Sequence, residues 1–175
     1  PQMLMSIRTL NLDEVNKLGE GVKAIALPDE RWDKVDIKTT NLIPNILAQT
    51  KAEKKFAYTA MLFRDGICTE GATSNVFAVK DGILYTHPAD NHILKGITRQ
   101  MIVTRVAPSL GITLIEKEFD RAFVDDADEL FFTDTIGGVI PIIKLDKNPV
   151  SGGKPGHVTL RLREALEKLM EEGLP

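Results

Sequence analysis

Residues 58–87 read YTAMLFRDGICTEGATSNVFAVKDGILYTH, in which four apolar runs are separated by small and polar residues. Asp65-Gly66 joins the first run to the second, and Asp81-Gly82 joins the third to the fourth. Asp-Gly is a preferred two-residue turn between antiparallel strands, because both positions adopt positive φ there. These residues therefore predict two β-hairpins, with strands at 58–64, 67–70, 74–80 and 83–87. They also place Glu70 and Gly71 at a strand end, next to other strand ends.

The flanking sequence predicts further strands and three longer helices. Apolar or alternating runs indicate strands at residues 22–27, 112–119, 129–135 and 139–145, and a strand-like piece at 4–8. Helical periodicity indicates helices at 43–55, 97–106 and 158–172, with a short acidic helix or loop at 122–128. The second helix should stop near Pro108 and Gly111. Because strands outnumber helices, we expect an α+β fold, a mixed sheet or pseudo-barrel surrounded by helices.

Two of these helices have an apolar side. The first carries Pro44 at a tolerated first-turn position. Its stripe at 3.6-residue spacing comprises Ile43, Ile46, Leu47, Ala48, Thr50 and Ala52. In the last helix, the face that we expect to be buried comprises Leu162, Ala165, Leu166 and Leu169.

Length and composition favour a single soluble globular domain. The chain has 175 residues, 43% hydrophobic and 27% charged, with a formal net charge of −3. A chain of this length buries about 70% of its unfolded surface. It has neither a basic footprint for nucleic acid nor a run of ~20 apolar residues for a membrane span. With one cysteine, Cys68, expected to be a small buried residue, and no leader-like segment, we expect a cytoplasmic protein.

Four ordered motifs carry a resemblance to a known family. They are Ile37-Lys38-Thr39, Cys68-Thr69-Glu70-Gly71-Ala72-Thr73-Ser74-Asn75-Val76-Phe77, Ile93-Leu94-Lys95-Gly96-Ile97-Thr98-Arg99 and Glu129-Leu130-Phe131-Phe132-Thr133-Asp134-Thr135. In this order they resemble the class IV (fold type IV) pyridoxal-phosphate-dependent aminotransferases. Residues 29–99 are most similar to the D-amino acid aminotransferases, whereas residues 131–141 and 154–156 are at least as similar to the branched-chain aminotransferases.

The resemblance also implies a domain organisation. Proteins of this family carry a smaller N-terminal domain before the lysine of the first motif, and Lys38 arrives early in this chain. We therefore expect residues 1–18 to be an interdomain linker remnant and residues 19–175 to be the larger, cofactor-binding domain, without the small N-terminal domain. The full-length form is expected to be a homodimer.

Lys38 is the candidate catalytic residue. A lysine forms an imine with an aldehyde cofactor only when its amine is neutral, which requires desolvation or a cationic neighbour. By resemblance, Lys38 holds pyridoxal 5′-phosphate as an internal Schiff base. Once substrate has displaced it, the same amine is expected to move the proton between the substrate α carbon and the cofactor aldehyde carbon, as general base and acid.

The resemblance assigns Glu70 to the cofactor ring nitrogen, which an acidic partner keeps protonated so that the ring withdraws electrons. Arg99 or another cation behind Glu70 could hold the carboxylate ionised. For the cofactor phosphate, Gly96-Ile97-Thr98 provides a glycine, two backbone N–H donors and a hydroxyl at a helix start. Thr135 would add a second hydroxyl, and Leu94 would pack on the ring.

Other polar clusters do not predict a site. His87, His92 and His157 show no metal-ligand spacing, so no metal is predicted. An acidic cluster is expected to be a solvated face; it comprises Asp125, Asp126, Asp128 and Glu129.

The leading functional prediction is a transaminase that exchanges an amino group between an amino acid and a 2-oxo acid, with a D-amino acid such as D-alanine favoured. A second candidate is a branched-chain L-amino acid aminotransferase, in which the backbone N–H groups of Ile136 and Gly137 would receive the substrate carboxylate. An aminodeoxychorismate lyase and a catalytically silent truncated domain also stay open. Asp134 departs from the family, which usually has glycine or serine there.

Overall fold

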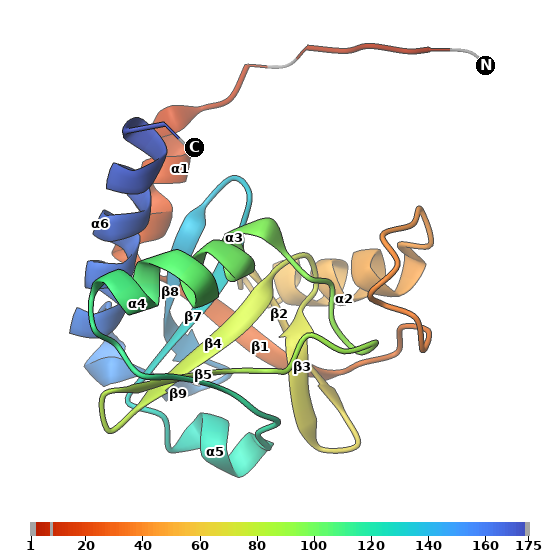
Figure 1. Ribbon diagram of the computed structural model, residues 1–175. Helices are drawn as coiled ribbons and strands as arrows, with labels where there is room; N and C mark the ends of the chain where they lie inside the picture. The colour runs from red at the N-terminus through yellow and green to blue at the C-terminus, as the bar shows by residue number, and fades with distance from the viewer. Residues whose placement is uncertain (1–2, 8, 174–175) are drawn as a thin grey trace.

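The computed structural model describes residues 3–7 and 9–173. Within them a mixed nine-stranded sheet forms the centre, and helices pack around it (Figure 1). The strands are β1 (Val22–Pro28), β2 (Thr59–Arg64), β3 (Ile67–Gly71), β4 (Asn75–Lys80), β5 (Ile83–Thr86), β6 (Leu114–Glu116), β7 (Glu129–Asp134), β8 (Gly138–Leu145) and β9 (Asn148–Pro149). The predicted α+β fold with a mixed sheet is confirmed.

The strand order along the sheet is β3-β2-β1-β8-β7-β4-β5-β6, with β9 beside β8. β1 runs parallel to β2 and β8, and β5 runs parallel to β6, whereas the other pairs are antiparallel. The sheet curls so that β3, at one edge, contacts β4. The end of β3, the start of β4 and the end of β7 therefore lie together, because Gly71 bonds Ser74 and Asn75 pairs with Thr133.

Both predicted hairpins form at the Asp-Gly turns. Arg64 lies opposite Ile67 in the first, and Lys80 lies opposite Ile83 in the second. In the first turn Asp65 and Gly66 have φ of 50° and 83°, and the equivalent residues of the second turn have 51° and 75°. Positive φ at both central positions is what a type I′ turn requires, so these turns also fix the strand register.

The helices are α1 (Leu12–Lys17), α2 (Ile43–Glu53), α3 (Ile97–Met101), α4 (Ala107–Ser109), α5 (Arg121–Asp125) and α6 (His157–Glu171). A π-helical turn, Ile102–Val106, joins α3 to α4. The helical segment ends at Ser109, one residue past Pro108, and Gly111 follows at φ 65°. No described helix is long and apolar enough to cross a membrane.

The core occupies both faces of the central strands. Successive residues of a strand point to opposite faces, so Phe77 of β4 packs with the π-helical turn and α6, while Val76 packs in the other core. Phe77 stacks on Phe131 of β7, with ring centroids 4.9 Å apart. The strands around the candidate site are thus held from both sides.

Some local predictions were wrong. Residues 4–7 form no strand, and Arg8 lies outside the described residues. The strand predicted at 112–119 is confined to Leu114–Glu116. The predicted linker, residues 1–18, stays a prediction; within it Leu12–Lys17 is a short helix, capped by the Asn11 side chain, which accepts from the N–H groups of Asp13 and Glu14.

The apolar stripe of α2 does not face the core as a whole. Ala48 and Ala52 are buried, whereas Ile43 and Ile46 are 69% and 59% exposed. α2 packs against β2 in a cluster of mostly small residues that includes Ala60, so only short side chains fit between helix and sheet. Residue size, rather than hydropathy, therefore decides which side of α2 is buried.

The side chain of Glu129, on β7, caps the N-terminus of α6. Glu129 is 8% exposed and accepts hydrogen bonds from the backbone N–H groups of Val158 (3.0 Å) and Thr159 (2.7 Å) and from the Thr159 hydroxyl (2.7 Å). The bonds satisfy free N–H groups and suit the helix dipole. Gly156 makes room, because a Cβ there would collide with Glu129. The prediction that Glu129 is solvated was therefore wrong.

Glu129→Ala should lower the free energy of unfolding by about 1–3 kcal/mol, because it leaves buried donors of α6 without an acceptor. Urea denaturation measures the loss. Glu164→Ala, an exposed glutamate on the same helix, is the matched control and should change stability by less than about 0.5 kcal/mol. Equal losses in the two variants would contradict the capping role.

Candidate active site

A pocket of about 360 Å³ lies where the end of β3, the start of β4, the end of β7 and the start of α3 meet the segment before α2. This volume is within the range of small-molecule sites. The structure brings together around it the six residues predicted to bind a cofactor, which are Lys38, Glu70, Leu94, Ile97, Thr98 and Thr135. Residues separated by up to about a hundred positions thus share one cavity, as the family resemblance implies.

Lys38 lies in the segment that connects β1 to α2. It lines the pocket, but its side chain is exposed to solvent. The adjacent Ile37 is 51% exposed and does not cover it. The desolvation that a neutral lysine amine requires is therefore not provided by the surroundings of Lys38 in this structure.

Glu70, near the end of β3, is 4% exposed and held by three donors. Its Oε2 accepts from the Asn75 side-chain amide (2.8 Å) and from the Leu94 backbone N–H (3.1 Å). Its Oε1 accepts from Nη1 of Arg31 in a buried ion pair. A carboxylate with both oxygens bonded has one orientation, so Glu70 is fixed at the pocket wall.

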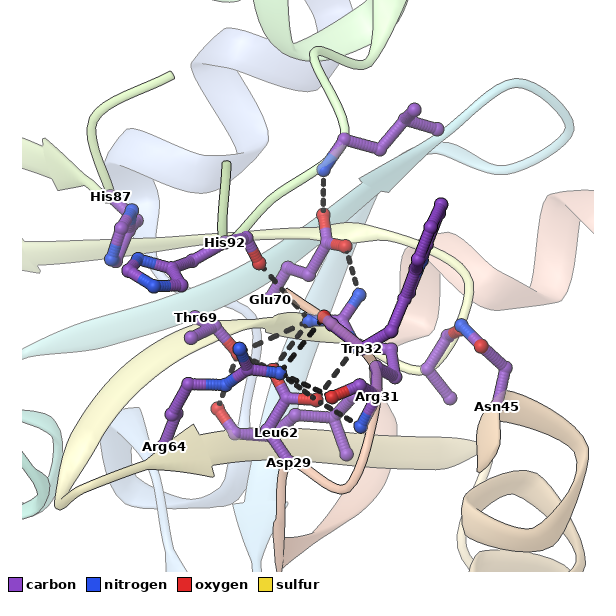
Figure 2. A network of polar contacts seen from close by, with 12 residues as sticks. Asp29, Arg31, Trp32, Asn45, Leu62, Arg64, Thr69, Glu70, His87 and His92 are labelled. Atoms are coloured by element: carbon purple, nitrogen blue, oxygen red, sulfur yellow. Dashed lines mark hydrogen bonds and ion pairs between the residues drawn. The ribbon is translucent and has the colours of Figure 1, made fainter. Parts of the chain in front are cut away.

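Arg31 is the cation behind Glu70, and Figure 2 shows it between Glu70 and Asp29. It is 8% exposed, and its Nε and Nη2 donate to the two Asp29 oxygens at 2.8 and 2.7 Å. Of the two possibilities, Arg99 or another cation, the second holds, because Arg99 donates to the His87 carbonyl and pairs with Glu116. In the sequence, the one feature that could have indicated this role for Arg31 is that acidic residues lie near it on both sides, at positions 29, 30 and 33.

Two opposing effects set the pKa values of Glu70 and Asp29: burial raises them, and the positive charge of Arg31 lowers them. Burial raises the pKa of Glu70 to about 7, although Arg31 and the Leu94 N–H oppose the increase. Burial also works against ionisation of Asp29, but the hydrogen bonds and charge of Arg31 outweigh it and lower the pKa of that carboxyl. Glu70 is consequently the carboxyl of the pair that is poised to titrate near neutral pH, and a positive charge in the pocket would ionise it.

The opposite wall offers groups for an anion. Thr98 lies in the first turn of α3, and its hydroxyl donates to the Asp134 carbonyl (2.9 Å). Gly96 precedes it at the pocket wall, where a Cβ would collide with the Asn75 amide oxygen. The buried hydroxyls of Ser74 and Thr133 also line the pocket and have no hydrogen-bond partner among the described residues.

Ile136 and Gly137 do not line the pocket among the described residues. Their backbone N–H groups donate to Oδ1 of Asp134 at 2.9 and 2.6 Å, and the Ile136 side chain is 64% exposed. An internal carboxylate thus occupies both donors. Their role as receptors of a substrate carboxylate stays a prediction, and it requires Asp134 to release them.

The donor set fits pyridoxal 5′-phosphate. A primary amine, a buried carboxylate with its own cation, and hydroxyls near a helix start are the groups that bind its aldehyde, ring nitrogen and phosphate. The two unpartnered hydroxyls, of Ser74 and Thr133, fit a ligand with many acceptor atoms.

Comparison with known proteins identifies relatives of the chain. The profile of the family described as Amino-transferase class IV matches residues 1–145. A D-alanine aminotransferase of Staphylococcus aureus (strain COL) is 42% identical over 154 residues, which cover 88% of this chain and 54% of the relative. The D-alanine aminotransferase of Bacillus licheniformis is 40% identical over 147 residues, covering 84% and 52%. The chain spans about half the length of these curated relatives.

Solved structures show the same fold. The branched-chain aminotransferase of Thermoproteus uzoniensis, solved with norvaline, has a TM-score of 0.80 at 31% identity, over 86% of this chain and 52% of that one. The branched-chain amino acid aminotransferase of Escherichia coli has a TM-score of 0.75 at 30% identity, over 85% and 52%. An aminotransferase of Brucella abortus bound to PLP has a TM-score of 0.76 at 26% identity, over 86% and 55%.

The pKa of Glu70 predicts a pH dependence of stability. Because its pKa is about 7 in the folded chain against 4.5 ordinarily, the folded state keeps a proton that the unfolded state releases between these values. The associated stability is complete below pH 4.5 and is lost as pH rises to 7. Glu70→Gln should remove this slope, at most about 1.4 kcal/mol per pH unit.

Urea denaturation of the cofactor-free chain at several pH values in this range gives the slope directly. Glu164→Gln, at an exposed position, should keep the wild-type slope. A slope in Glu70→Gln equal to that of the wild type would show that Glu70 is already ionised throughout.

Arg31→Met should lower the free energy of unfolding by about 3–5 kcal/mol, because it leaves the buried Glu70 without its cation and Asp29 with only its longer contact to Arg64 (3.6 Å). The surface pair of Lys51 with Glu30, 3.6 Å apart with both side chains more than half exposed, is the comparison. Lys51→Ala should cost less than about 1 kcal/mol. Similar losses in both variants, measured by urea denaturation, would mean that the Arg31 network contributes no more than a surface pair.

Proposed function

The chain belongs to the class IV aminotransferase family, and we propose that it is the cofactor-binding part of a pyridoxal-phosphate-dependent transaminase. The reaction transfers an amino group between an amino acid and a 2-oxo acid. The observation that carries this proposal is the convergence of Lys38, the Arg31-held Glu70 and Thr98 on one pocket. Residues 19–175 are on this view the large domain, and residues 1–18 lead into it.

Lys38 does the covalent and proton-transfer work in this proposal. Pyridoxal 5′-phosphate, when bound, supplies an electron sink for the bonds at the substrate α carbon. The Lys38 amine would hold the cofactor and, once freed by substrate, would remove a proton from that carbon as general base and deliver it to the aldehyde carbon of the cofactor as general acid. Because its side chain is exposed here, binding of cofactor and substrate must supply the desolvation that keeps the amine neutral.

Glu70 is the proposed partner of the cofactor's ring nitrogen. Its carboxylate faces the pocket with Arg31 behind it, so its position does not depend on the ligand. A protonated ring nitrogen next to Glu70 would lower its pKa from about 7, and the two groups would then ionise each other. Arg31 is therefore a positioning residue, because it acts on the cofactor only through Glu70.

Thr98, Thr135 and the backbone N–H groups at Ile97 and Thr98 would hold the phosphate, and Leu94 would pack against the ring. This assignment is supported by the place of these residues on the pocket wall and by the start of α3, whose dipole favours an anion. Asp134 lines the same wall, and its negative charge would repel the phosphate. A bound phosphate therefore favours the conformation in which the Asp134 carboxylate accepts from the amides of Ile136 and Gly137.

For the substrate we favour a D-amino acid such as D-alanine, supported by the D-alanine aminotransferases among the relatives. A branched-chain L-amino acid is the second candidate, supported by the branched-chain enzymes among the similar structures. The N–H groups of Ile136 and Gly137, which would receive the substrate carboxylate in a branched-chain enzyme, already donate to Asp134, and this weighs against the second candidate. Stoichiometric conversion of the bound cofactor to pyridoxamine phosphate by an amino donor separates both from a lyase such as aminodeoxychorismate lyase.

Turnover is proposed for a longer protein. The relatives are nearly twice as long as their matched part, and we infer that the additional portion completes the substrate side of the pocket, so that this chain alone is catalytically silent. We also propose a cytoplasmic homodimer, supported by the exposed apolar side chains of Ile43 and Ile46 on α2. Losing substrate orientation costs on the order of 7–11 kcal/mol of barrier reduction.

Borohydride reduction of the chain in the presence of pyridoxal 5′-phosphate should fix the cofactor on Lys38. Peptide mapping by mass spectrometry locates the label. Lys38→Arg should abolish the specific label, whereas Lys34→Arg, which changes an exposed lysine four residues earlier, should leave it in place. Equal labelling of several surface lysines, or a main label elsewhere, would contradict the assignment of Lys38.

A further inference from the structure

His87, Asp90 and His92 converge just after β5, outside the lining of the candidate active site. One nitrogen or oxygen atom from each lies within 4.8 Å of the others. Figure 2 shows the two imidazole rings side by side, and their centroids are 6.2 Å apart. We propose that these three side chains bind a divalent transition metal ion of the zinc class.

The spacing of the donor atoms is close to that of a metal site. Bonds of about 2.0–2.1 Å in a tetrahedron place neighbouring ligand atoms about 3.3–3.4 Å apart. Nδ1 of His92 lies 3.4 Å from Oδ2 of Asp90. The third donor, from His87, needs a shift of no more than about 1.5 Å, because it already lies within 4.8 Å of both.

Hydrogen bonds hold the loop in this geometry and leave Oδ2 of Asp90 and the ring of His92 available to the ion. The His92 backbone N–H donates to Oδ1 of Asp90 (2.8 Å), which leaves Oδ2 for the ion. Nδ1 of His87 lies 3.8 Å from Oδ1 of Asp90 and also 2.9 Å from the Pro88 carbonyl oxygen, so an ion that binds this nitrogen replaces its contact with the carbonyl. Arg31 donates to the His92 carbonyl and Arg99 to the His87 carbonyl.

The chemistry of the donors selects the ion. Two imidazoles and one carboxylate suit zinc, cobalt or nickel, whereas magnesium prefers oxygen donors alone. His87 is 2% exposed, and Cys68 is fully buried and offers no competing thiolate at the surface. The four residues between His87 and His92 fall within the spacing of paired histidine ligands, so the sequence spacing of these two histidines is compatible with a metal site.

A bound ion would close the loop of residues 87–92, which leads directly to Leu94 and Gly96 at the pocket wall. The loop also touches Arg31 through the His92 carbonyl (3.3 Å). The proposed role is therefore a structural clamp beside the candidate active site, with one coordination position left for water. It does not depend on the proposed transaminase activity.

Isothermal titration calorimetry of the cofactor-free chain with Zn²⁺ should show one saturable site per chain. Asp90→Ala and His92→Ala should each weaken binding by at least about tenfold, a loss that even outer-shell changes cause. The side chains of Asp90 and His92 are 34% and 36% exposed, so these variants should fold. His157→Ala removes the remaining histidine, which is exposed at the start of α6, and should bind like the wild type.

Co²⁺ provides a second readout, because its visible absorption reports nitrogen and oxygen ligands in a low-coordinate site. Circular dichroism of each variant confirms that the fold is kept. The proposal is overturned if Zn²⁺ shows no saturable binding, if His92→Ala binds as tightly as the wild type, or if His157→Ala loses as much affinity as His92→Ala.

Discussion

The buried ion network of Glu70, Arg31 and Asp29 is the constraint around which the site is built. Each charge is almost fully removed from water, which costs several kcal/mol per ion unless its partners compensate. The network joins the residues after β1 to the end of β3 and, through the Leu94 N–H and the His92 carbonyl, to the loop before α3. Three separate segments are thereby fixed relative to one another, which is why one end of the pocket is formed in advance.

The topology explains why this network can exist. The curl of the sheet brings the end of β3 to the start of β4, and the antiparallel pairing of β4 with β7 adds Thr133 and Asp134 to the same end. Gly71 and Gly96 let these segments approach, since a Cβ at either would collide with Ser74 or Asn75. The pocket is therefore lined by side chains at the ends of β3, β4 and β7, and the central residues of β4 and β7 are packed in the two cores.

Local sequence patterns predicted the sheet, and the family motifs predicted several pocket residues. Contacts between residues far apart in the sequence were not predicted. The Asp-Gly turns specify both hairpins within a few residues, and the motif order placed Glu70, Thr98 and Thr135 at one pocket. Arg31 was missed because its pairing with Glu70 spans 39 positions and depends on the curl. The burial of Glu129 was missed for the same reason, because its partners on α6 are about 30 residues away.

The two ends of the pocket differ in how much they depend on a ligand. At the carboxylate end, Glu70 is fixed by three donors and shielded from solvent, so a change at Arg31 must affect stability and, on the proposed function, cofactor binding as well. At the lysine end, Lys38 is exposed and makes no ion pair in the described structure, so its replacement should leave the fold undisturbed and, on the proposed function, remove only the chemistry. If Lys38 is the nucleophile that we propose, this arrangement fixes the carboxylate in advance and leaves the amine to be desolvated only when the cofactor is in place.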